Sequence, residues 1–250
     1  MLNSRAMRIP PVDLPYLREQ LRDIAAQLRE AWDSSSHARD EVDTPRLLRD
    51  AMAQLLDMLG HIHDASPEAN PSAAEINTLG EYGLHLLDEM AQLAADLEQP
   101  SLARTVERLC LPFALWIARH GGEIRSLAPV VNALAHFANN ISQPQQLAEL
   151  YGYCCELIEA TSPVCHEQLS GDTRQPWRLL LLNRAIVATR SHNTALIECA
   201  YDAIVEYLPH EAHRFFSEGM EQMAAIDYPQ HVQNLVRRYF LAHAKPKSLH

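Results

Sequence analysis

One period of the stretch that decides the fold, residues 176–207, reads PWRLLLLNRAIVATRSHNTALIECAYDAIVEY. It begins at a proline, breaks at a short polar segment around His192, and carries apolar residues at helical spacing on both sides of that break. Proline fits the first turn of a helix, where its missing N–H has no partner to lose. Prolines recur 32, 32 and 33 residues apart, at Pro112, Pro144, Pro176 and Pro209. The spacing therefore predicts four helical hairpins in series over 112–244.

The composition predicts an all-α protein throughout. The 250 residues are 47% apolar, which is ample for a buried core, and contain only 8 glycines. That number leaves few of the turns that a sheet protein needs. Before the array we expect helices over 14–32 and 44–62, the second with Thr44 as its N-cap, and a long helix around 76–97. Gly80 and Gly83 in the long helix allow close packing or a bend.

Within the array, Pro112 predicts a kink or a fresh helix start, because it removes an internal hydrogen bond. Gly121-Gly122 predicts a turn, and 163–169 predicts a short helix. The chain is divided into an acidic N-terminal helical segment, 1–100, and a hairpin array, 101–250, which we expect to form one continuous folded unit.

A period of 32 to 33 residues with two helices per unit resembles the tetratricopeptide class of helical-hairpin repeat proteins. Phe215 and Gly219, after the break at Pro209, are the closest approach to that family's residue pattern. The resemblance implies a short α-solenoid whose groove holds a peptide or another protein. An irregular helical bundle is the alternative fold.

The net charge of −11 excludes the basic footprint of a nucleic-acid-binding protein and offers no attraction to an anionic membrane surface. The acidity is concentrated in residues 1–100, which hold 18 acidic and 8 basic residues. The five cysteines are odd in number and include no C-x-x-C pair, so we expect reduced thiols. No secretory leader or membrane-spanning run is expected, which predicts a cytoplasmic protein.

Two predicted helices carry an acid, a histidine and an acid at i, i+4 and i+7, which places each set on one helical face. The first set is Asp57, His61 and Asp64, and the second is Glu81, His85 and Asp88. If the two helices are antiparallel neighbours, these six side chains could converge as ligands for a hard or borderline metal. The candidate metal residues are Asp57, His61, Glu81 and His85. The opposing interpretation is a pair of solvated helix faces.

Three further sequence patterns are candidates for a catalytic or metal-binding site. His63-Asp64 resembles the doublet of the HD phosphohydrolases, which implies a metal-dependent phosphohydrolase. Cys165, near a predicted helix start, is a candidate thiolate nucleophile. His210 and His213 share a face with Glu206 and are a candidate transition-metal site. For each, a packed or solvated side chain is the competing interpretation.

The sequence favours a non-catalytic scaffold or adaptor that binds a protein or peptide in a helical groove and needs no cofactor. A metal-dependent all-helical enzyme that uses the acid-histidine faces is the alternative, so enzyme activity is left open. A homo-oligomer is a third possibility.

Overall fold

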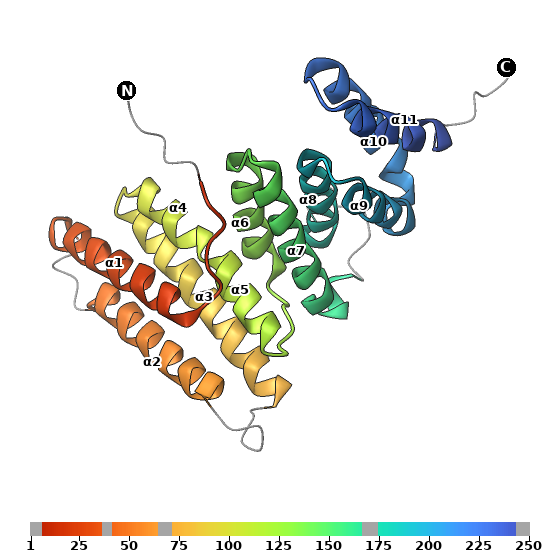
Figure 1. Ribbon diagram of the computed structural model, residues 1–250. Helices are drawn as coiled ribbons and strands as arrows, with labels where there is room; N and C mark the ends of the chain where they lie inside the picture. The colour runs from red at the N-terminus through yellow and green to blue at the C-terminus, as the bar shows by residue number, and fades with distance from the viewer. Residues whose placement is uncertain (1–6, 37–41, 65–71, 167–174, 244–250) are drawn as a thin grey trace. The chain divides into compact units, whose positions relative to one another are not determined.

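The computed structural model describes residues 7–36, 42–64, 72–166 and 175–243 (Figure 1). Across these residues the protein is all-α, and its only β feature is one isolated bridge between Ile124 and Thr161. The helices are α1 (Leu14–Asp33), α2 (Thr44–Asp64), α3 (Ala73–Asp96), α4 (Pro100–Arg108), α5 (Cys110–Arg119), α6 (Leu127–Asn140), α7 (Pro144–Ala160), the 3-10 turn η3 (Pro163–Cys165), α8 (Pro176–Ser191), α9 (Thr194–Tyr207), α10 (Pro209–Ala225) and α11 (Gln230–Ala242).

The described residues fall into two compact units. The first comprises 10–137 and 156–166, and the second comprises 7–9, 138–155 and 175–243. Helices α6 and α7 each contribute to both units. The expected boundary at residue 100 lies inside the first unit, where α4 and α5 pack against α1 and α3.

The first unit is built around α3, which packs against α2, α4 and α5, while α1 packs against α2. Its centre contains fully buried side chains from four helices: Leu17, Leu55, Leu87 and Phe113. The close approach of α3 and α5 depends on Gly83, because a Cβ atom there would lie 2.2 Å from Phe113 Cζ. The predicted role of this glycine in close packing is therefore confirmed.

Glu81 of α3 holds the loop that leads into α6. Its Oε1 accepts hydrogen bonds from the backbone N–H groups of Arg125 and Ser126 at 3.1 and 3.0 Å, and its Oε2 accepts the Ser126 hydroxyl at 2.6 Å. The loop follows the predicted turn, in which Gly121 has a φ of 81°, a conformation that glycine adopts without strain. A side chain of α3 thus fixes the start of α6.

The second unit contains two consecutive hairpins, α8 with α9 and α10 with α11, and α9 packs against both helices of the later hairpin. Figure 1 shows the two pairs following each other along the chain. The core of this unit is aromatic: Tyr201 of α9 lies 5.0 Å from Phe216 of α10 and 5.1 Å from Tyr239 of α11, measured between ring centroids. Aromatic rings at these separations pack favourably.

The prolines begin helices as expected at α7, α8 and α10. Near Pro112 the helix is interrupted at Leu109 and α5 begins at Cys110, two residues before the proline, so the fresh start is confirmed. The N-cap of α2 is Asp43 rather than Thr44, since Asp43 Oδ1 accepts the N–H of Arg46 at 3.3 Å.

The short helix expected over 163–169 is wrong in its described part, which contains only the 3-10 turn η3. Residues 167–169 lie outside the described residues. In the described ranges, no helix combines the length and the apolar character needed to cross a bilayer.

Candidate binding pocket

A pocket of about 420 Å³ lies between α8 and α10 in the second unit. Pockets of this size are typical of ligand sites. Its wall is mostly apolar and is formed by Leu182 and Ile186 of α8, Phe215 and Met223 of α10, and Ile226 and Tyr228 before α11. Ile186 and Ile226 are 43% and 50% exposed, so part of this wall is open to water. Exposed apolar side chains around a concavity are typical of a binding surface.

Two hydroxyl groups lie among the apolar wall residues. The oxygens of Thr189 and Tyr201 are 2.8 Å apart, and the Thr189 hydroxyl donates to the carbonyl of Ala185 at 2.8 Å. Since Thr189 has only one proton to donate, the Tyr201 hydroxyl must donate to Thr189. Burial raises the pKa of Tyr201 to about 12, which keeps this donor protonated at neutral pH. The hydroxyl pair is therefore satisfied without a ligand.

The two carboxylates of the lining, Glu211 and Glu218, are paired with arginines. Arg178 donates to both carboxylate oxygens of Glu211, with Nε 2.5 Å from Oε1. This hydrogen bond holds the pKa of Glu211 below its usual value. Arg214 lies 3.4 Å from Glu211 and 3.5 Å from Glu218. The rim thus carries no uncompensated charge among these residues, which favours an apolar occupant over a strongly charged one.

Arg190, the remaining charged residue of the lining, makes hydrogen bonds to backbone carbonyls. Its guanidinium donates to the carbonyl of Ala138 and, at 2.7 Å, to that of Ile141. Ala138 lies in the last turn of α6 and Ile141 directly follows the helix, where helix geometry leaves carbonyls without intrahelical partners. Arg190 therefore caps the C-terminal end of α6.

Two contacts between helices of successive hairpins join residues 33 positions apart. Arg178 and Glu211 are 33 residues apart, and each is the third residue of its helix. Arg184 of α8 and Tyr151 of α7, whose side chains are 2.7 Å apart, are also separated by 33 residues. The pocket was not predicted from the sequence. The signal that could have revealed it is the opposite charge of Arg178 and Glu211 at equivalent positions of two periods.

The acid-histidine faces of α2 and α3, which were candidates for a metal site, make hydrogen bonds or ion pairs with different parts of the first unit. Asp57 Oδ1 accepts from Arg18 at 2.7 Å, and His61 Nδ1 lies 2.7 Å from the carbonyl oxygen of Asp57. Both carboxylate oxygens of Glu81 hold the loop before α6. His85 Nε2 lies 3.4 Å from Glu89 Oε1 on its own helix. Hydrogen bonding within the fold thus accounts for these side chains.

Within the described residues, no three side chains from His, Cys, Asp and Glu gather closely enough to hold a metal ion. The side chains of His63 and Asp64, and therefore the doublet that resembles the HD phosphohydrolases, lie outside that description. The metal-dependent alternative stays a prediction, which metal analysis of the purified protein tests.

The contacts and exposure of Cys165, His210 and His213 are those of packed or solvated side chains. Cys165 lies in the turn η3, where its thiol donates to the Arg125 carbonyl at 3.3 Å. Burial raises the pKa of this thiol, which opposes the thiolate that nucleophilic chemistry requires. His213 stacks against Phe240 with 6.0 Å between ring centroids, and His210 is exposed near the start of α10.

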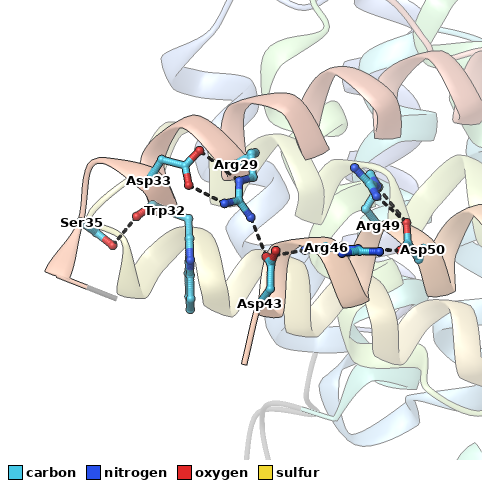
Figure 2. Close-up of polar contacts among 8 residues, drawn as sticks. All are labelled: Arg29, Trp32, Asp33, Ser35, Asp43, Arg46, Arg49 and Asp50. Atoms are coloured by element: carbon cyan, nitrogen blue, oxygen red, sulfur yellow. Dashed lines mark hydrogen bonds and ion pairs between the residues drawn. The ribbon is translucent and has the colours of Figure 1, made fainter. Parts of the chain in front are cut away.

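A second groove, of about 900 Å³, lies between α1 and α2 in the first unit. Arginines 18, 22, 29 and 49 line it above an apolar floor that includes Leu21, Met52 and Met90. Each arginine has a carboxylate nearby. Figure 2 shows the arrangement at one end of the groove, where Arg29 binds Asp33 of its own helix and Asp43 before α2, both at 2.6 Å. Exposed pairs of this kind contribute little stability.

In the same view Arg49 binds Asp50 at 2.7 Å, and Arg46 lies 3.6 Å from the same carboxyl group. The positive charge around this groove is therefore balanced locally by aspartates, and it does not mark the groove as an anion site.

No protein-family model, curated protein or solved structure matches the chain.

Proposed function

We propose that this protein is a non-catalytic binding module, and that a peptide or another protein inserts a large apolar side chain into the pocket between α8 and α10. The observation that carries the proposal is the partly exposed apolar wall of a concavity of about 420 Å³ whose two carboxylates, Glu211 and Glu218, are paired with arginines. Apolar pockets that receive a single anchor side chain dominate the energetics of many protein interfaces.

The repeated 33-residue contacts support this proposal. They connect α7 with α8 and α8 with α10, the helices that begin at Pro144, Pro176 and Pro209. In stacked helical hairpins, the first helices of successive units line a common groove. The pocket lies between two such helices, which is where the resemblance to tetratricopeptide repeats would place a bound peptide.

The test compares apolar side chains inside and outside the pocket. A benzophenone amino acid at Gln222, which lines the pocket, should crosslink a partner in native lysate, whereas the same group at Leu241 of α11 should not. Ile186→Asp should then weaken binding of the identified partner at least tenfold. A buried anchor contributes about 1.5–3 kcal/mol, and about 1.4 kcal/mol corresponds to tenfold.

Leu241→Asp is the matched control, because Leu241 is 65% exposed and lies outside the pocket. It should leave binding unchanged. A crosslink to a second copy of the chain that Ile186→Asp abolishes would identify a homo-oligomer as the occupant. Absence of a Gln222 crosslink, or equal losses from Ile186→Asp and Leu241→Asp, would refute the proposal.

A further inference from the structure

Two cysteines from different helices meet around one arginine in the second unit. Arg184 of α8 donates through Nη2 to the Tyr151 hydroxyl of α7 at 2.7 Å and to Cys199 Sγ of α9 at 3.1 Å. Cys155 follows Tyr151 by one helical turn, so the two side chains share a face of α7. Its thiol interacts with the Tyr151 hydroxyl and with the guanidinium of Arg184. The fold therefore gathers both thiols, the phenol and the guanidinium.

The two thiols differ in ways that suit them to successive roles. Cys199 is exposed, so a peroxide in water can reach its sulfur, and this sulfur accepts a hydrogen bond from the Arg184 guanidinium. Cys155 is half-buried, and burial raises the pKa of its thiol. The adjacent Cys154 is fully buried, and burial raises its pKa as well, so it is inaccessible to reagents in water.

The guanidinium is held firmly in place. It lies over the Tyr151 ring, with 5.0 Å between its central carbon and the ring centroid. Its Nε is buried and makes no hydrogen bond, whereas Nη2 donates to both Tyr151 and Cys199. A charged group desolvated on one side interacts more strongly with the neighbours it has.

From this geometry we infer that Cys199 and Cys155 form a redox-sensitive pair, in which a peroxide oxidises Cys199 and Cys155 then closes a disulfide between α9 and α7.

The chemistry balances in two steps. The Cys199 thiolate attacks one oxygen of hydrogen peroxide, the O–O bond breaks, and the released hydroxide takes a proton to become water, which leaves a sulfenic acid on Cys199. The Cys155 sulfur then attacks the Cys199 sulfur and displaces the hydroxyl group, which leaves as a second water with the Cys155 proton. Overall, two thiols lose two electrons and two protons, and one peroxide becomes two waters.

The experiment treats the reduced full-length protein with hydrogen peroxide, blocks remaining thiols by alkylation and maps peptides by mass spectrometry without reduction. The expected product is one intramolecular peptide pair that links Cys155 to Cys199 and is two hydrogens lighter than its reduced components. A disulfide forms only between adjacent side chains, so the link also reports their proximity. In Cys155→Ser, dimedone should label Cys199 as a sulfenic acid.

Cys165→Ser is the control and should leave the link unchanged, because Cys165 belongs to the turn η3 in the other unit. Arg184→Gln should slow oxidation of Cys199 at least tenfold, and Arg184→Lys should restore most of the rate if the positive charge is what matters. Failure to form the Cys155–Cys199 link, a dominant link to Cys165, or no dimedone label on Cys199 in Cys155→Ser would overturn the inference.

Discussion

At the scale of single residues, the first unit depends on the missing side chain of Gly83. A Cβ atom there would lie 2.2 and 2.6 Å from ring carbons of Phe113 and 2.8 Å from Leu55 Cδ2. Phe113 and Leu55 are themselves fully buried, so neither has free space to move into. The helix pair α3 and α5 can therefore keep its present separation only with glycine at this position.

Gly83→Ala is expected to lower the free energy of unfolding by about 1–3 kcal/mol, the usual cost of overpacking a core. Urea denaturation followed by circular dichroism measures the change. Gly152→Ala is the matched control. Gly152 is also helical, but a Cβ atom there meets nothing within 4 Å. The control should raise stability by about 0.5–1 kcal/mol. Equal effects of the two substitutions would contradict this packing.

At the scale of elements, the Arg178–Glu211 pair connects α8 with α10. The side chain of Arg178 is 10% exposed and that of Glu211 is 26% exposed. Hydrogen bonds to charged groups contribute about 1.5–3 kcal/mol, and Glu211→Gln should cost that amount at pH 7. Glu218→Gln, which alters a 65% exposed side chain of the same helix, should cost far less.

The cost of Glu211→Gln should also depend on pH. Because the pKa of Glu211 is lowered in the folded protein, its contribution is complete above the unfolded value of about 4.3. It is lost as the pH falls through the lower folded value. Urea denaturation at pH 7 and at successively lower pH should show the variant and the wild type converging in acid. A cost that stays constant down to acid pH would show that the carboxylate charge does not stabilise this pair.

Helix starts were the most predictable elements. Proline in a first turn and an acidic or hydroxyl N-cap act through local geometry, so a few adjacent residues suffice to locate the beginnings of α1, α7, α8 and α10. The N-cap of α2 was misplaced by one residue because Asp43 and Thr44 are both good caps. The extent of η3 was misjudged because a proline start does not determine how long a helix continues.

The candidate site was less predictable than the helices. Its residues come from α8, α9, α10 and the segment before α11, and only their packing brings them together. For the acid-histidine faces the sequence pattern is present, but it did not predict the actual partners of the side chains. Their helical spacing is real, but Glu81 is used by Arg125 and Ser126, which are 44 and 45 residues away. Spacing within one helix carries no information about such distant partners.

At the scale of the whole molecule, the two compact units should differ in cooperativity. A hairpin is stabilised chiefly by the elements it packs against, so one packed on a single helix opens more readily than a helix packed on several sides. The α10–α11 hairpin packs against α9, whereas α3 packs against three other helices of its unit. Native-state hydrogen exchange should therefore show faster opening of α10–α11 than of α3.

Two core truncations extend this test. Phe216→Ala should cost about 3–5 kcal/mol and Leu87→Ala about 2–5 kcal/mol, since both side chains are fully buried. Phe216→Ala should accelerate exchange in α9 to α11 and leave α3 unchanged, and Leu87→Ala should do the reverse. Uniform acceleration by either variant would show that the chain unfolds as a single cooperative unit and would favour the bundle over the array.

The reach of Glu81 also has a consequence for synthesis of the chain. Its partners at Arg125 and Ser126 follow it by 44 and 45 residues, so Glu81 leaves the ribosome well before either of them. Because a chain emerges from its N-terminus during synthesis, we expect this carboxylate to remain hydrated until the loop before α6 has emerged. The order of translation thus makes α3 a template on which the start of α6 is later positioned.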